Sequence, residues 1–105
     1  MIIYGTHADD ITPDTENDDF IFGRAGDDTF LYYFGNDFIF GGQGDDIFIV
    51  SPQVDAIVYI NGGRGDDTLV LARDPISVDH IGNKMIIHYD YDMVIITERV
   101  DELSI

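Results

Sequence analysis

The chain has 105 residues, enough for a single domain, and 45% of them are hydrophobic, so a core can form. Its 21 acidic residues outnumber five basic ones and give a formal net charge of −16, which argues against binding nucleic acid or an anionic membrane through a basic surface. Cysteine is absent, which excludes disulfides and thiolate metal sites, and with no long apolar run or basic leader after Met1 we expect neither a membrane span nor a cleaved secretion signal.

The first predicted element is a repeat of nine residues, with aspartate as its sixth residue. The aspartates are Asp10, Asp19, Asp28, Asp37, Asp46, Asp55 and, after an apparent insertion at 59–61, Asp67. The units are 5–13, 14–22, 23–31, 32–40, 41–49, 50–58 and 62–70. Their eighth residue is large and apolar in all but the first unit. We therefore expect each unit to form a six-residue turn and then a short strand whose middle residue points inward.

Two units make one coil of 18 residues, so alternate units stack on opposite sides of the molecule. The odd turns are 5–10, 23–28, 41–46 and 62–67, and most of them are rich in glycine. The even turns are 14–19, 32–37 and 50–55, which have lost most of the glycines but retain the aspartate. The two sides are therefore not expected to be chemically equivalent.

Three of the odd units have the sequences GRAGDDTFL (23–31), GGQGDDIFI (41–49) and GGRGDDTLV (62–70). They resemble the pattern G-G-x-G-x-D-x-U-x of RTX (hemolysin-type) calcium-binding repeats. The resemblance implies an all-β fold, a right-handed parallel β-roll, that is, a β-solenoid of nonapeptide repeats. We expect the roll to occupy residues 1–70 and a C-terminal antiparallel β cap to occupy residues 71–105.

The aspartate column also favours calcium on physical grounds. Carboxylates stacked at ~4.8 Å, the spacing of neighbouring strands, repel by roughly 3 kcal/mol per pair at an effective dielectric of 20. Oxygen ligands in flexible glycine turns suit Ca²⁺, whereas Mg²⁺ demands a tighter octahedron. Zn²⁺ favours histidine and cysteine, and the three histidines show no ligand spacing. Several Ca²⁺ ions are therefore the expected cofactors.

The resemblance also implies a ligand set, made of main-chain carbonyls and aspartates from neighbouring turns. The first odd site would use Thr6, Ala8, Asp10, Gly23, Ala25 and Asp28. The second would use Arg24, Gly26, Asp28, Gly41, Gln43 and Asp46. The third would use Gly42, Gly44, Asp46, Gly62, Arg64 and Asp67. On the even side, Asp19 and Asp37 would bind an ion together with carbonyls of Thr15, Asn17, Tyr32 and Phe34.

Beyond the repeat, 76–81 and 84–89 are predicted strands around Gly82-Asn83, an order that favours a type II′ hairpin. Residues 93–97 and 103–105 are expected to add two more strands. Since the last coil of a solenoid exposes its core, this segment is predicted to cap the roll. It also resembles the region that follows RTX repeats in proteins exported by type I secretion, so we expect a secreted, extracellular protein that folds when it meets Ca²⁺.

Other interpretations stay open at this point. The aspartates could only cap turns, or two of them could form a hydrolase pair, although an even ladder singles out no pair and we expect no enzyme. Binding of a carbohydrate, adhesion and a self-associating structural unit are further alternatives.

The seventh and ninth residues of each unit should face solvent, yet in the even units they are apolar. They are Phe20, Phe22, Phe38, Phe40, Ala56 and Val58. We expect this face to be covered, either by strands from 76–97 folded back over it or by the same face of a second molecule in a homodimer.

Overall fold

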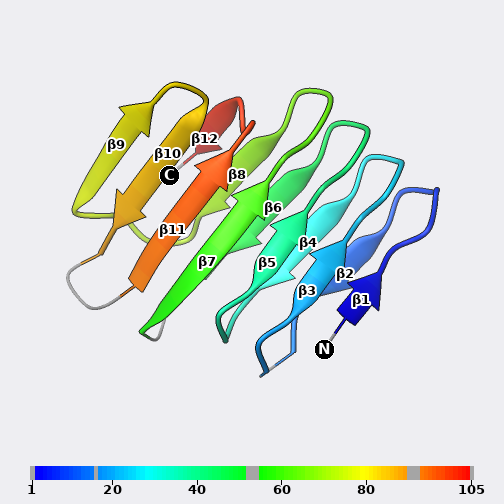
Figure 1. The fold of residues 1–105 in the computed structure, drawn as a ribbon, viewed down its shortest axis with the longest axis horizontal. Helices are drawn as coiled ribbons and strands as arrows, with labels where there is room; N and C mark the ends of the chain where they lie inside the picture. Colours follow the sequence, from blue (N-terminus) through cyan, green and yellow to red (C-terminus); the bar gives the residue numbers. More distant parts are fainter. Residues whose placement is uncertain (1, 16, 52–54, 90–92, 105) are drawn as a thin grey trace.

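The computed structural model describes residues 2–15, 17–51, 55–89 and 93–104, which form two sheets connected by tight turns (Figure 1). Sheet A contains, in spatial order, β1 (Ile2–Tyr4), β3 (Phe20–Phe22), β5 (Phe38–Phe40), β7 (Ala56–Asn61), β11 (Met93–Glu98), β10 (Lys84–His88) and β9 (Ser77–Ile81). Sheet B contains β12 (Glu102–Ser104), β8 (Thr68–Leu71), β6 (Ile47–Val50), β4 (Thr29–Tyr32) and β2 (Ile11–Pro13). Consecutive strands of the repeat alternate between the sheets, and each coil adds one parallel strand to both, which confirms the predicted parallel β-roll.

The core lies between the two sheets and is built from the eighth residues of the units. Ile21 pairs with Ile39 across β3 and β5, and Phe30 pairs with Phe48 across β4 and β6; all four side chains are buried. The rings of Phe30 and Phe48 stack with centroids 5.0 Å apart. The period of nine thus places identical positions above one another, so that the core is a column of like side chains.

The sixth unit, 50–58, differs from the prediction, because the three extra residues lie before the segment that pairs with β5 and not after it. Strand β7 is six residues long, and Tyr59, not Ala56, pairs with Phe38. Ile57 was expected in the core and is 58% exposed, whereas Val58 was expected outside and is buried. Ala56 is buried as well, which corrects the predicted outer face at this unit.

The same displacement removes Asp55 from the aspartate column. The amide of Tyr59 donates to the carbonyl of Asp37, just as the amide of Phe38 donates to the carbonyl of Asp19. Val58 is therefore the residue that stacks on Asp37 one coil further on, where an aspartate was expected. Asp55 is exposed at the preceding bend. Its step of nine from Asp46 is a coincidence of spacing.

The C-terminal segment contains the predicted hairpin and also continues the roll. Strands β9 and β10 are antiparallel around Gly82-Asn83, and β10 pairs antiparallel with β11. Strand β11 in turn pairs in parallel with β7, and β12 pairs in parallel with β8. Strands β11 and β12 are therefore a fifth coil, with the hairpin added beyond it at the edge of sheet A (Figure 1).

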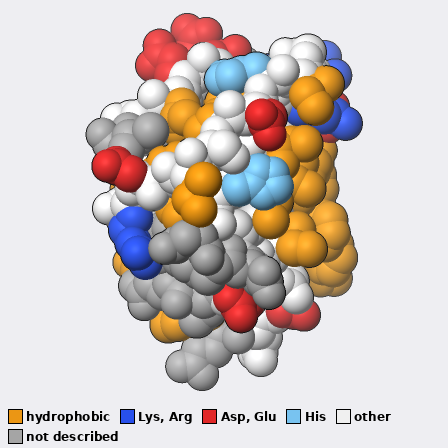
Figure 2. All heavy atoms as spheres, turned by 90° about the vertical axis from the view of Figure 1, so that its left-hand side faces the viewer, with side chains coloured by type: hydrophobic (Ala, Val, Ile, Leu, Met, Phe, Trp, Pro, Cys, Tyr) orange, Lys and Arg blue, Asp and Glu red, His pale blue; other side chains and the backbone are white. Residues whose placement is uncertain are grey.

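The strands of this segment extend sheet A edge to edge and do not fold back over its outer face, so that version of the predicted cover is wrong. Phe20 and Phe38 remain 46% and 43% exposed on that face. Figure 2, viewed from the β9 end, shows hydrophobic side chains gathered along one side of the molecule. None of the described segments forms a helix with the length and apolar character that a membrane crossing requires.

Candidate metal centre

The sixth-position aspartates of the odd turns are connected by hydrogen bonds from coil to coil. The amide of each aspartate donates to Oδ1 of the aspartate one coil further on. The distances are 2.8 Å from Asp10 to Asp28, 2.8 Å from Asp28 to Asp46 and 2.9 Å from Asp46 to Asp67. One carboxylate oxygen of each residue after Asp10 is thereby satisfied, and the side chain is held in a fixed orientation.

The second carboxylate oxygen has no such partner. Asp28, Asp46 and Asp67 are at most 1% exposed, yet their Oδ2 atoms accept no hydrogen bond from any described residue. A buried charged oxygen is unfavourable unless a donor or a cation compensates for its lost hydration. The three odd turns thus contain a repeated, uncompensated negative oxygen.

The first-position glycines show where a compensating cation could lie. A methyl group placed on Gly23 would lie 2.7 Å from Asp28 Oδ2 and 2.7 Å from the carbonyl oxygen of Gly41 in the next coil. A methyl group on Gly41 would likewise crowd Asp46 Oδ2 and lie 2.8 Å from the carbonyl oxygen of Gly62. Two oxygens from neighbouring coils, together with the ring edge of Phe30 or Phe48, therefore border a space that a side chain at this position would overfill. We call this space the cradle of each glycine.

The rest of each turn stacks its main chain closely on the next. Gly26, Gly44 and Gly65, the fourth residues, have φ of 93°, 112° and 99°, a region that side chains other than glycine rarely adopt. The amide of Gln43 donates to the carbonyl of Arg24, and the amide of Arg64 donates to the carbonyl of Gly42. Carbonyls and carboxylates of consecutive turns are consequently held at a regular spacing, and such hard oxygen donors suit Ca²⁺.

The first coil is closed differently in both stacks. The amide of Thr6 donates to Asp10 Oδ2 at 2.6 Å, and the Thr6 hydroxyl also bonds to this carboxylate. Thr15 does the same for Asp19, with an amide bond of 2.9 Å to Oδ2. A threonine therefore satisfies the oxygen that stays unpartnered in the later odd turns, which makes the first predicted odd site the least suited to an ion.

The even side also lacks the open cradle. Its first-position residues are Asp14 and Tyr32, and the Asp14 carboxylate accepts the amides of Tyr33 and Phe34 at 3.0 Å each. Asp37 Oδ1 still accepts a hydrogen bond from the Asp19 amide, and the buried Oδ2 of Asp37 has no partner among the described residues. The two sides of the roll are thus chemically different, as their glycine content predicted.

The comparison with protein families agrees with this geometry. The model of the RTX calcium-binding nonapeptide repeat matches residues 14–32, 33–55 and 58–73, more than half of the chain. The chain belongs to the RTX calcium-binding repeat family. A search of curated proteins finds no match. The RTX repeat is a structural calcium-binding unit and not a catalytic one.

Burial changes the acidity of the RTX aspartates. It raises the pKa of Asp46 and of Asp67 to about 7, the neighbouring carboxylates add to the effect, and the bound main-chain amide opposes it. The pKa of Asp37 is also raised to about 7, first by burial and then by the nearby Asp14, and that of Asp28 is raised for the same leading reason. Without a cation, the folded roll therefore favours protonation of these groups.

Sequence reasoning missed two features of the RTX turns. The fifth-position aspartates form a second, exposed ladder, in which the amides of Asp27, Asp45 and Asp66 each donate at 2.8 Å to the aspartate one coil earlier. The Asp-Asp doublets of the sequence could have indicated this second ladder. The inner ladder also continues beyond the repeats, since the amide of Asp67 donates to Asp101 Oδ2 at 2.9 Å.

Proposed function

We propose that this RTX roll binds several Ca²⁺ ions between its odd turns and completes its folding when it binds them. The observation that carries the proposal is the buried, unpartnered Oδ2 of Asp28 and Asp46, each next to an open glycine cradle and a carbonyl of the following coil. The second and third predicted ligand sets fit this arrangement best, because their turns contain the glycines and their aspartates are aligned. The ion supplies the positive charge that the stacked carboxylates lack.

A small extracellular protein or module is the setting that this behaviour favours. RTX repeats are typical of secreted proteins, and extracellular calcium modules bind with dissociation constants of ~10⁻⁴–10⁻³ M. A chain with a formal net charge of −16 stays loosely folded where calcium is scarce, because its carboxylates repel one another. It becomes compact where calcium is abundant, so secretion, including export by a type I route, belongs to the same proposal.

Isothermal calorimetry tests the ligand assignment with substitutions that remove one charge and little volume. Asp46→Asn retains an acceptor for the Asp28 amide but weakens the oxygen that faces the Gly41 cradle, so we expect the loss of at least one bound Ca²⁺. The matched control is Asp55→Asn, since Asp55 is exposed and lies outside the ladder. An equal loss for both variants, or no loss for Asp46→Asn, would show that the carboxylate column does not bind the ions.

We also propose that the outer face of sheet A pairs with a second copy of the chain. The exposed rings of Phe20 and Phe38 stack with centroids 5.1 Å apart, and the half-buried rings of Phe22 and Phe40 stack at the same distance. Tyr59 packs against both rows, with centroids 5.9 Å from Phe38 and 6.0 Å from Phe40. A regular apolar surface of this kind is what two-fold self-association buries most readily.

Sedimentation velocity in Ca²⁺ tests this homodimer. We expect the unmodified chain to dimerise and the double variant Phe38→Asp, Phe40→Asp to be a calcium-binding monomer. Ile47→Asp on the outer face of sheet B is the control, because Ile47 is 41% exposed there and its change should leave the dimer intact. An unmodified chain that stays monomeric at high concentration contradicts the proposal.

A further inference from the structure

The segment between β11 and β12 is a shortened copy of an odd turn. The amide of Gly62 donates to the carbonyl of Glu98 at 2.9 Å, as the amide of Gly41 donates to the carbonyl of Asn61 at 2.8 Å. Arg99 therefore occupies the first position of this turn, and Asp101, directly before β12, occupies the sixth. The residues of positions two to five have no counterpart, because the tail passes from Arg99 to Asp101 through Val100 alone.

The shortened turn retains the two features that border each cradle. Asp67 is 0% exposed, and its Oδ2 accepts no hydrogen bond from a described residue. A methyl group placed on Gly62 would meet both Asp67 Oδ2 and the carbonyl oxygen of Arg99. The Gly62 cradle is thus bordered by a buried carboxylate of the last repeat and by a carbonyl of the tail, like the Gly23 and Gly41 cradles between repeats.

The surroundings of this cradle add further oxygen atoms. The carbonyls of Gly42 and Gly44 lie against Gly63 and Gly65 of the next turn. By the same stacking, we expect the carbonyls of Gly63 and Gly65 to point toward the tail, whose shortened turn has only Val100 between Arg99 and Asp101. Asp101 contributes a carboxylate whose Oδ2 accepts the Asp67 amide.

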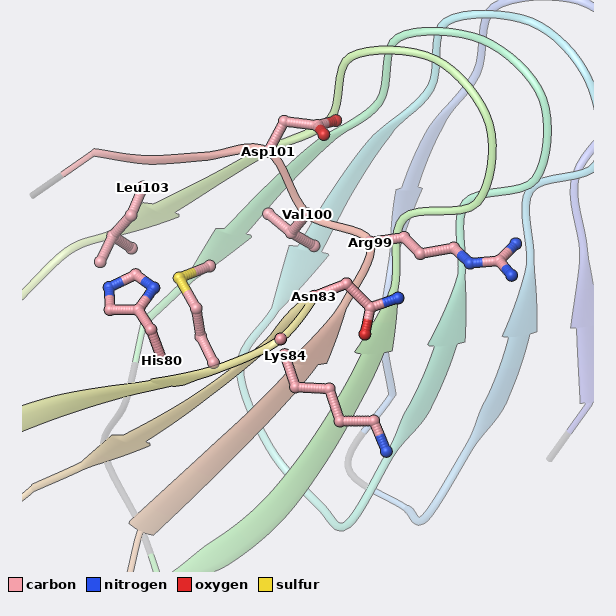
Figure 3. Close-up of a pocket in the computed structure, with 9 residues that line it drawn as sticks. His80, Asn83, Lys84, Arg99, Val100, Asp101 and Leu103 are labelled. Atoms are coloured by element: carbon pink, nitrogen blue, oxygen red, sulfur yellow. The ribbon is translucent and has the colours of Figure 1, made fainter.

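The positive side chains at this end point away from the Asp101 carboxylate (Figure 3). Figure 3 shows the carboxylate of Asp101 and the guanidinium of Arg99 on separate sides of the tail, with Lys84 further away on β10. The charge of Asp101 also acts on Asp67 as an additional repulsion. The negative charges of Asp67 and Asp101 therefore repel each other at this end of the aspartate ladder.

We propose that Asp67 and Asp101, together with the main-chain carbonyls of Arg99, Gly63 and Gly65, form an additional Ca²⁺ site that fastens the C-terminal tail to the last repeat. The site rests on the calcium binding proposed above, but its tail half, Arg99 and Asp101, lies outside the residues that the family model matches. Because the third-position carbonyl is missing and Asp101 is exposed, water completes the coordination, and this ion binds more weakly than those between full turns.

A calcium ion at this site connects the docking of β12 to the metal. Strand β12 is only three residues long and pairs solely with β8 among the described strands. The ion would therefore set whether the tail is attached to the roll or released from it, at a calcium concentration above that needed for the repeats.

Hydrogen exchange, followed by mass spectrometry across a Ca²⁺ titration, tests this site together with calorimetry. In the unmodified chain, amides of 99–104 should become protected at a higher Ca²⁺ concentration than those of 23–50. Asp101→Asn and Gly62→Ala, the second of which fills the cradle, should each remove this late protection or shift it at least about tenfold in Ca²⁺. Asp101→Asn should also leave the protection of 23–50 in place. Glu102→Gln is the control, since it removes one charge next to Asp101 and should change neither.

The results distinguish a failure of the tail site from a failure of the proposed function. Protection of 23–50 without any calcium response at 99–104, or unchanged stoichiometry and tail protection in both Asp101→Asn and Gly62→Ala, overturns the tail site alone. The absence of calcium-dependent protection anywhere overturns the proposed function as well. Use of two variants prevents a folding defect in one of them from deciding the result.

Discussion

In EDTA the chain is expected to lose most of its β-sheet circular dichroism signal, and millimolar Ca²⁺ is expected to restore it. At ~4.8 Å and an effective dielectric of 20, each pair of neighbouring carboxylates repels by roughly 3 kcal/mol. Four pairs along the two columns give a repulsion on the order of 10 kcal/mol, comparable to the whole stability of a typical domain. Protonation relieves part of this repulsion, but at pH 8 most of it remains for a cation to neutralise.

Magnesium provides the control for this experiment. It carries the same charge but holds its water and demands a tighter octahedron, so equal concentrations should restore far less structure. Recovery of the full signal in Mg²⁺ would reduce the effect to screening of the net charge. Identical spectra and melting temperatures in EDTA and in Ca²⁺ would contradict metal-linked folding outright.

Acid is expected to replace part of the calcium. Asp37, Asp46 and Asp67 have pKa values raised to about 7 in the folded, metal-free roll, against an ordinary value near 4. Between about pH 4 and 7 the folded state binds protons that the unfolded state has released, so stability falls as the pH rises through this window. In EDTA the melting temperature should therefore be roughly 10 °C or more higher at pH 5 than at pH 8, since about 1 kcal/mol shifts it by ~4–8 °C in a domain of this size.

Calcium affinity should have the opposite pH dependence, because Ca²⁺ displaces these protons, and it should rise from pH 5 to about pH 8. Asp46→Asn removes one of the titrating groups, so in EDTA its melting temperature should depend less on pH than that of the unmodified chain. Asp55→Asn should leave this pH dependence unchanged. Equal melting temperatures at pH 5 and pH 8 in EDTA would contradict the assigned protonation.

The sequence predicts the roll well because its period of nine is simultaneously a pattern of turns, strands and core residues. Position six, position eight and the glycines agree over units 23–31 and 41–49, and the structure stacks them in that phase. The hairpin around Gly82-Asn83 is predicted from local turn chemistry and is confirmed. Most of the fold could thus be predicted from the repeat and from local turn residues.

The displacement at β7 could not be recognised in this way. Both Ile57 and Ile60 suit an inward eighth position, and Asp55 preserves the step of nine, so the pattern alone does not locate the three extra residues. The choice is made by pairing with β5, where Tyr59 meets Phe38 and Ile60 enters the core. This is a long-range contact, which a single period cannot reveal.

The tail shows the same limit for the candidate site. Residues 101–104 match the second half of the repeat, aspartate followed by a short strand with apolar Leu103 in its middle, and this was the available signal. It lacks the glycine half, so no period connects it to Asp67. Only the parallel pairing of β12 with β8 brings Asp101 to the end of the aspartate ladder.

A crystal structure grown in Ca²⁺, with a long-wavelength anomalous map to identify the metal, tests most directly whether the unpartnered carboxylate oxygens mark the ion sites. We expect anomalous peaks in the cradles of Gly23 and Gly41, at ~2.3–2.6 Å from Asp28 Oδ2 and Asp46 Oδ2 and bound also by carbonyls of the next coil. A fully ordered roll with no peak in either cradle, or with calcium only on the exposed ladder of Asp27 and Asp45, would contradict this assignment.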